Sequence, residues 1–90
     1  MDLDALLAQV ARGRFEFRAD GDSDEAFREF GMTVDAACHA FMRGYVASLH
    51  TQWGERCGRR CTEAVFVREL TEKGRRFLDK VEAKIVPVRA

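Results

Sequence analysis

Val65-Phe-Val-Arg-Glu-Leu-Thr-Glu-Lys-Gly-Arg-Arg-Phe-Leu78 indicates a short β-strand that leads directly into a helix. Residues 65–67 suit a pleated, half-buried backbone because they are β-branched or aromatic. Thr71 is placed to cap the free amides of the helix that follows, and Glu72 adds negative charge at its positive end. Gly74 has no side chain, so another segment of backbone can approach the first helical turn closely. The stretch therefore predicts a tight joint between strand and helix.

A second joint lies earlier in the chain, where Met42-Arg-Gly-Tyr-Val46 ends one helix on a glycine and begins another strand. Together the two joints resemble those of the winged-helix DNA-binding domains of bacterial transcription regulators, such as the MarR-like and PadR-like repressors. In that superfamily a helix ending in Gly-aromatic-Val leads to the first wing strand, and Leu-Thr-x-x-Gly-Arg closes the second. The resemblance covers nearly the full chain and implies a fold, whereas function has to be argued separately.

The bulk composition is that of one soluble domain over residues 1–90. Charged residues make up 33% of the chain and apolar residues 47%, as in ordinary globular proteins. The amino terminus is acidic and amphipathic, unlike a secretory signal, and no apolar run approaches the roughly 18 residues that span a bilayer. The three cysteines do not suggest a disulfide framework. We therefore expect a cytoplasmic protein with no membrane partner.

The charge distribution is uneven although the net charge is zero. Zero net charge counts against DNA binding, because most affinity for nucleic acids comes from neutralising phosphates with Lys and Arg. Up to Asp35 there are nine acids and four arginines, whereas beyond it there are six acids and eleven basic residues. Either a basic face meets nucleic acid, or the two halves attract each other within or between subunits.

Hydrophobic spacing, caps and turn residues predict a succession of helices and strands. In chain order these are a helix over 2–13, a strand over 14–18, a helix that Asp22 begins, a helix over 33–45, a strand over 45–53, a loop over 54–63, a strand over 64–70 and a helix over 72–84. Gly31 is expected to separate the second and third helices, and Thr33 to cap the third. The order matches an α+β, winged helix-turn-helix plan: a three-helix core, a small antiparallel β-wing and a C-terminal helix.

Apolar residues at helical spacing predict the core. The buried stripe of the third helix is expected to include Val34, Ala37, Cys38, Phe41 and Tyr45, with Ala36 and Ala40 on the outer face. The full predicted core is Leu6, Leu7, Val10, Phe27, Phe30, Val34, Ala37, Phe41, Leu49, Phe66, Leu70, Phe77, Leu78 and Val81.

By the resemblance, the helix Thr33–Tyr45 would enter the major groove of DNA. Its outward face would offer Thr33, His39 and Arg43 as DNA-binding residues, because arginine can contact a phosphate or a guanine and histidine can donate. Asp35 faces the same way and would repel phosphates. This face carries few of the polar and basic side chains that read bases.

The wing Gly54–Glu63 is better equipped for DNA. Arg56, Arg59 and Arg60 lie on its glycine-containing tip and suit a minor groove or phosphates. The alternative is a solvated charged loop. These two interpretations stay open on the sequence alone.

The cysteines are predicted to be free thiols without a metal. Cys57 and Cys61 lie in the wing, and Cys38 lies on the stripe predicted to be buried. The alternative is a metal or redox sensor, but one Cys-x-x-x-Cys pair does not supply four ligands. No set of side chains resembles a catalytic site, so we expect no enzyme activity and no cofactor.

The sequence favours a small DNA-binding transcription regulator. Its expected partners are double-stranded DNA and a second copy of the chain, with the amino- and carboxy-terminal helices as the homodimer interface. The alternative is a winged-helix module for protein interaction or dimerisation that does not bind DNA. Zero net charge and Asp35 favour that alternative.

Overall fold

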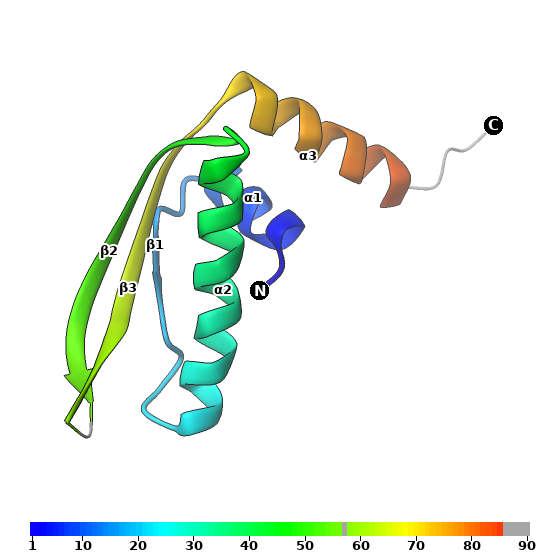
Figure 1. Cartoon of the computed structure of the whole chain (residues 1–90). Coiled ribbons are helices and arrows are strands. Elements are labelled where there is room, and N and C mark those ends of the chain that lie inside the picture. The colour runs from blue at the N-terminus through cyan, green and yellow to red at the C-terminus, as the bar shows by residue number, and fades with distance from the viewer. Residues whose placement is uncertain (57, 86–90) are drawn as a thin grey trace.

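The computed structural model describes residues 1–56 and 58–85 of the chain. These residues form an α+β fold in which three helices accompany a small antiparallel sheet of three strands (Figure 1). In chain order the elements are α1 (Leu3–Ala11), β1 (Glu16–Arg18), α2 (Asp24–Met42), β2 (Val46–Arg56), β3 (Arg59–Leu70) and α3 (Glu72–Ile85).

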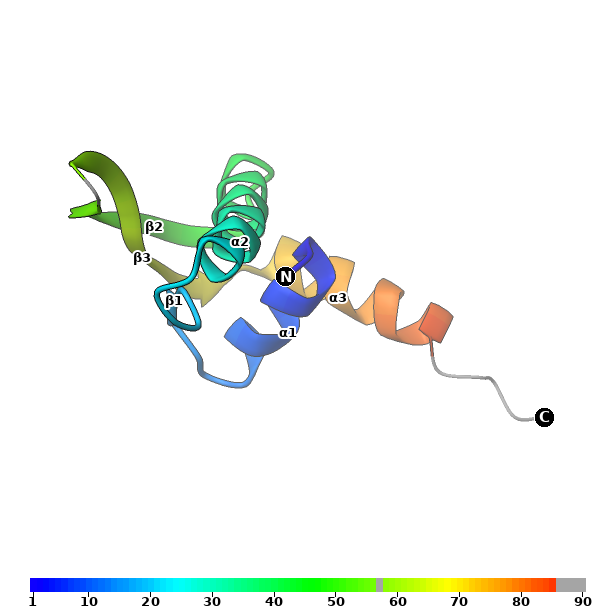
Figure 2. The same ribbon diagram turned by 90° about the horizontal axis from the view of Figure 1, so that it is seen from below.

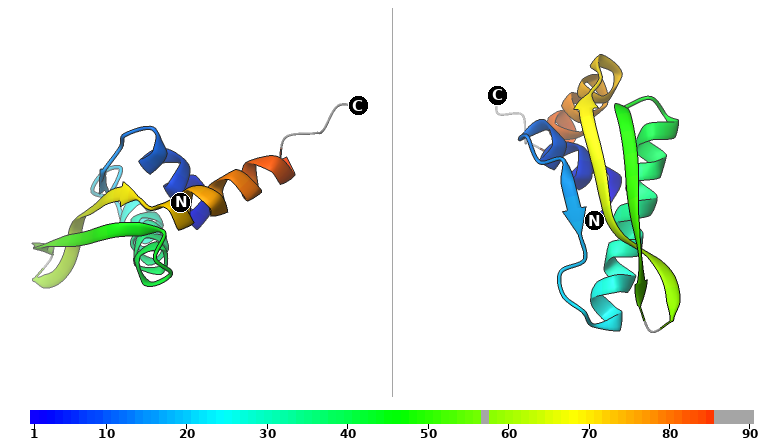
Figure 3. Two further views of the ribbon diagram at one scale, coloured as in Figure 1. Left: turned by 90° about the horizontal axis from the view of Figure 1, so that it is seen from above. Right: turned by 90° about the vertical axis from the view of Figure 1, so that its left-hand side faces the viewer.

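The sheet has the order β1-β3-β2, so β3 lies in the middle. Phe17 of β1 is opposite Val65 of β3, and Leu49 of β2 is opposite Val67. Directly opposite residues share one face of an antiparallel sheet, and Phe17, Val65 and Val67 are buried. This buried face is turned toward α2, whereas none of the three described helices covers the other face (Figure 3, right).

The first helix agrees with the sequence prediction. Asp2 is its N-cap, and the carboxylate accepts a hydrogen bond from the amide of Ala5 at 2.9 Å. Leu6 and Leu7 are fully buried. The strand that follows is shorter than predicted: β1 begins at Glu16 rather than at residue 14.

The predicted break at Gly31 is wrong, because α2 is one continuous helix. The helix runs through Gly31 without ending there. A Cβ at this position would meet nothing within 4 Å, so no close contact requires a glycine. Thr33 is not a cap but an interior residue of α2, and its side chain is buried. The cap of α2 is Ser23 and not Asp22: the Ser23 hydroxyl accepts from the amide of Ala26 at 3.0 Å.

The hairpin is longer than predicted, because most of the expected loop 54–63 is strand. The ladder continues through Gly54↔Cys61 to Arg56↔Arg59. One register shift lies between Gln52 and Trp53, where β3 carries the extra residue. Since β1 pairs only with residues 64–66, the outer half of the hairpin is held by its own two strands.

The joint between β3 and α3 confirms the prediction made from its sequence. The Thr71 hydroxyl accepts from the amide of Gly74 at 3.0 Å, which caps α3. The same hydroxyl donates to the carbonyl of Gly44 at 2.6 Å, and the Thr71 amide donates to the carbonyl of Tyr45 at 2.9 Å. A Cβ on Gly74 would lie only 2.1 Å from the Tyr45 carbonyl oxygen, so glycine is required for this approach.

The core differs from the prediction on α2. Phe41 is 45% exposed, so its assignment to the core is wrong. Ala36 and Ala40, expected on the outer face, are buried. Small side chains on this face let α2 lie close to the sheet and to α1. The buried apolar residues are Leu6, Leu7, Phe17, Phe30, Ala36, Ala37, Ala40, Tyr45, Val46, Ala64, Val65, Val67 and Leu78.

The molecule is elongated. In Figures 1 and 2 the hairpin β2–β3 and the far end of α3 extend away from α1 and α2 in different directions. The principal-axis extents are 56 × 25 × 19 Å and the Cα radius of gyration is 14.5 Å. Tyr45 fixes the start of α3 by stacking on Phe77, with 4.7 Å between the ring centroids.

Candidate nucleic-acid interface

The outer end of the hairpin carries the arginines predicted for the wing. Arg59 begins β3 and pairs in the backbone ladder with Arg56, and Arg60 follows it. The side chains of Arg59 and Arg60 are exposed. Gly58 turns the chain with φ of 74°, a conformation that glycine adopts at no steric cost. These arginines therefore lie at the end of the hairpin, as predicted, but on its strands rather than in a loop.

An aromatic side chain holds one of these arginines. The guanidinium carbon of Arg60 lies 5.2 Å from the ring centroid of Trp53, within the range of a cation–π interaction. Trp53 is 53% exposed, so the ring has an open part beside the cation. Glu55 is directly opposite Arg60 and offsets part of its charge. The hairpin end thus presents both a cation and an aromatic surface to solvent.

The second predicted group lies at the C-terminal end of α2. Arg43 is the C-cap of the helix, and its Nε donates to Nε2 of His39 at 2.7 Å. Both side chains are exposed. Thr33, the third residue expected on this face, is buried at 7% exposure and cannot reach DNA. The proposed set on α2 is therefore reduced to His39 and Arg43.

These two groups do not form one site. Arg43 precedes β2 and the hairpin arginines follow it, so the 11 residues of β2 separate them. At about 3.3 Å per residue the strand spans about 35 Å. A ligand must therefore be as long as one turn of duplex DNA, about 34 Å, to contact both ends.

The exposed face of α2 is acidic along most of its length. The exposed acids on the helix are Asp24, Glu25, Glu29 and Asp35, against the single exposed base Arg28 before His39. A helix that enters a groove meets phosphates on both sides, and this charge would oppose it. The α2 helix therefore lacks the electrostatics of a base-reading helix.

Lys73 is a basic residue near Arg43 that the sequence analysis missed. Its ammonium lies 5.7 Å from the Tyr45 ring centroid, and its Cδ lies 4.0 Å from the position of a Cβ on Gly44. The signal was present in the Leu-Thr-x-x-Gly joint, since the joint brings the first turn of α3 against the end of α2. On the same helix Arg76 is paired with Glu72 at 2.6 Å and is mostly solvated.

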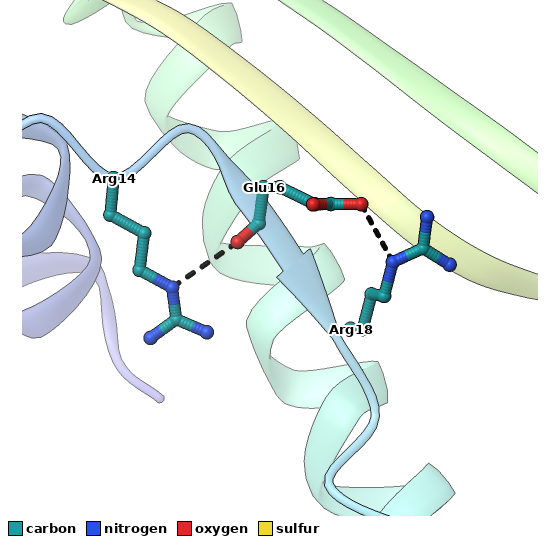
Figure 4. Close-up of polar contacts among 3 residues, drawn as sticks. All are labelled: Arg14, Glu16 and Arg18. Atoms are coloured by element: carbon teal, nitrogen blue, oxygen red, sulfur yellow. Dashed lines mark hydrogen bonds and ion pairs between the residues drawn. The ribbon is translucent and has the colours of Figure 1, made fainter.

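A further cluster of charge lies on β1, which the sequence analysis did not assign to a site. Arg14 donates from Nε to the carbonyl oxygen of Glu16 at 3.2 Å, and Arg18 donates from Nε to the Glu16 carboxylate at 2.6 Å. Figure 4 shows the two guanidinium groups on opposite sides of β1, each bonded to a different oxygen of Glu16.

A cavity of about 600 Å³ lies between β1 and the first half of α2. Both of these arginines line it, together with Glu16, Asp20 and Glu29. Because its charges are mixed, the cavity does not favour an anion or a cation.

The cysteine and metal predictions can be followed only in part. Cys38 and Cys61 are free thiols, and both are half-buried, so Cys38 is less buried than its predicted place in the core implied. Cys57 lies outside the described residues. Among residues 1–56 and 58–85, no group of three His, Cys, Asp or Glu side chains is placed to hold a metal ion.

Comparison of the chain with protein-family models, with curated proteins and with solved structures finds no match. Within the described part of the chain, no helix has the length and apolar character needed to cross a membrane.

Proposed function

We propose that this chain is a small DNA-binding regulator of winged-helix type that contacts DNA mainly through the end of the hairpin β2–β3. The observation that carries the proposal is the pair of exposed arginines, Arg59 and Arg60, on a hairpin whose outer half extends beyond β1. Guanidinium groups on a projecting hairpin suit phosphates and the minor groove.

The arrangement of the elements supports the winged-helix interpretation. A short strand pairs with the second strand of a hairpin, one helix leads into the hairpin and another follows it. The main difference from the plan is α2, which occupies the positions of both the second and the third helix. This difference, and the acidic face of α2, favour a contact with the DNA backbone over base reading by a helix.

The Trp53 ring supports Arg60 in this role. A guanidinium held against an aromatic face keeps its donors free while losing less rotational freedom when it binds. Phosphate contacts of this kind carry no sequence information. We therefore expect affinity that depends strongly on salt and weakly on base sequence.

The test is fluorescence anisotropy with a labelled random duplex at several salt concentrations. Each phosphate contact contributes about 0.9 to the slope of log affinity against log salt. The double variant Arg59→Ala/Arg60→Ala should therefore lower that slope by about 2 and weaken binding.

A matched control is Arg75→Ala/Lys80→Ala, which removes the same charge from exposed positions of α3. The control should keep most of the affinity and the slope. If the two variants behave alike, net charge alone governs binding and the hairpin has no special role. If the unmodified protein does not bind at about 100 μM protein in low salt, DNA binding itself is refuted.

A second candidate function, a protein-interaction module, is favoured by the exposed apolar residues of α2. Met32 is 60% exposed, Met42 84% and Phe41 45%. Methionine-rich surfaces bind varied apolar partners. The substitution Met42→Ser should weaken binding to a protein partner and leave affinity for duplex DNA unchanged. The variant Arg59→Ala/Arg60→Ala should instead weaken DNA binding and leave binding to the protein partner unchanged.

A further inference from the structure

Within the described part of the chain, the outer edge of β2 is a long row of backbone groups that pair with no other strand. The strand order β1-β3-β2 leaves β2 with a neighbour on one side only. Among residues 1–56 and 58–85, no backbone hydrogen bond from a turn, loop or cap reaches β2 from the other side. An edge of this kind can pair with a strand of another chain.

The two edges of the sheet differ in protection. Edge strands in natural proteins are commonly short or carry charges, proline or bulges that prevent pairing. β1 has three residues, of which Glu16 and Arg18 are charged. β2 has 11 residues, and the segment 46–54 contains no proline, Asp, Glu, Lys or Arg. The chain is 33% charged, so this uncharged edge is a departure from its composition.

The register shows which backbone groups point outward from β2. The amide of Val67 donates to the carbonyl of Phe15 at 2.8 Å, so Val67 directs its backbone groups toward β1. In an antiparallel sheet successive residues alternate, so Phe66 and Arg68 bond to their β2 partners His50 and Ser48.

On β2 the residues between those partners therefore point their backbone groups outward. They are Leu49 and Thr51, and Trp53 follows them in the same alternation because the extra residue of the register shift is on β3. These three residues also share the face of the sheet that is turned toward α2, whereas Ser48, His50 and Gln52 share the solvent face.

We propose that a second copy of this chain pairs with the outer edge of β2, antiparallel, with Thr51 opposite Thr51 of the partner subunit. This register places Leu49 opposite the partner subunit's Trp53, and it places His50 opposite the partner subunit's Gln52. Two sheets of three strands become one sheet of six.

The register is self-complementary in chemistry. Apolar and β-branched side chains meet on one face, where the half-exposed Trp53 gains cover, and uncharged polar side chains meet on the other. Glu55 falls opposite the partner subunit's Ala47, so no like charges face each other. Because β2 fits its own copy in this register, a second copy of the chain is the partner that suits this edge.

The first test is sedimentation equilibrium of the whole chain and of Thr51→Pro. By the alternation above the amide of Thr51 points away from β3, and no turn, loop or cap among residues 1–56 and 58–85 bonds to it. Proline at this position should therefore remove a bond of the dimer and leave the intramolecular ladder intact. We expect a reversible dimer that Thr51→Pro weakens by at least about tenfold. The control Thr51→Val keeps the amide and should dimerise as before, and circular dichroism should be alike in all three.

The second test is cross-linking, which does not depend on the proline variant. Directly opposite, hydrogen-bonded residues of an antiparallel pair have Cα atoms about 5.5 Å apart, within the range that a disulfide bridges. With the native cysteines changed to serine, Thr51→Cys should form a covalent dimer on mild oxidation, whereas Ser48→Cys should not.

Three results would overturn the proposal. A monomeric chain up to about 1 mM protein, the weak end of specific association, would exclude a second copy and leave a strand of another protein as the occupant. A dimer that Thr51→Pro does not weaken would place the interface elsewhere. So would a dimer in which Ser48→Cys cross-links as readily as Thr51→Cys. None of these measurements involves DNA, so they stand apart from the proposed function.

Discussion

Gly74 sets how closely the base of the hairpin can approach the first turn of α3. A Cβ at this position would lie 2.1 Å from the carbonyl oxygen of Tyr45 and 2.9 Å from Cδ1 of Leu70. The backbone at Tyr45 cannot move freely, because the Thr71 amide is bonded to the same carbonyl. Gly74→Ala should therefore lower the free energy of unfolding by about 1–3 kcal/mol, as overpacking does.

Urea denaturation followed by circular dichroism measures this loss. The neighbouring variant Arg75→Ala is the control, since that side chain is exposed and its removal should change stability by less than about 0.5 kcal/mol. Alanine is the better helix former by about 1 kcal/mol. A more stable Gly74→Ala protein would therefore show that helix propensity outweighs the close contact and that the joint is looser than described.

Residues whose role depends on near neighbours could be predicted from the sequence, and residues whose role depends on the phase of a long helix could not. Thr71 and Gly74 act within one turn of each other, so their pattern predicted both the cap and the close approach. Thr33 and Phe41 were misplaced because the helix they occupy is capped by Ser23 and begins at Asp24, not near Thr33. The start of the helix decides which of its residues are recognised as caps and which as interior positions.

At the scale of the element, α2 was the main error. The buried stripe of α2 runs through Phe30, Thr33, Ala37 and Ala40, which are mostly small residues. Hydrophobicity ranks Phe41 above threonine and alanine, so a pattern based on hydrophobicity selects the wrong side of the helix. Close packing against α1 and the sheet favours the small residues. That preference depends on distant neighbours, which local sequence does not reveal.

Gly31 provides the test of a continuous α2. If the helix passes through it, Gly31→Ala should raise the free energy of unfolding by about 0.5–1 kcal/mol, because alanine is the better helix former and nothing lies within 4 Å of the added Cβ. The measurement is the same urea denaturation. A loss of stability of similar size would support a break between two helices at this residue.

The hairpin was correctly placed but its length was underestimated. The loop prediction rested on the polar and glycine-containing residues from Gly54 to Glu63. Cross-strand pairing extends regular structure into that segment up to Arg56 and from Arg59 onward. For the candidate site, the sequence identified the hairpin arginines and the His39–Arg43 pair. It did not show that the two groups lie at opposite ends of one strand.

At the scale of the whole molecule, the projecting elements give the chain a larger radius of gyration than a compact domain with the same number of residues. A compact domain of this length has a radius of gyration of about 12 Å, whereas the Cα atoms give 14.5 Å. X-ray scattering of Thr51→Pro, which is monomeric under our proposal, should give a radius of gyration closer to 14.5 Å than to that of a compact domain.

A shortened hairpin is the matched comparison. In the alternation described above Gly54 directs its backbone groups to Cys61, so residues 55–60 can be replaced by an Asn-Gly turn that closes the ladder at this pair. The shortened protein should scatter as a more compact particle and should lose affinity for duplex DNA. An unchanged radius would mean that the hairpin does not project in solution.

The central position of β3 also has a consequence for amide hydrogen exchange. Along this strand Val65 and Val67 direct their amides to β1, whereas Phe66 and Arg68 direct theirs to β2. Detaching the three residues of β1 costs less free energy than opening the long hairpin. The amides of the two buried valines should therefore exchange with deuterium faster than those of their less buried neighbours, in an alternating pattern along a single strand.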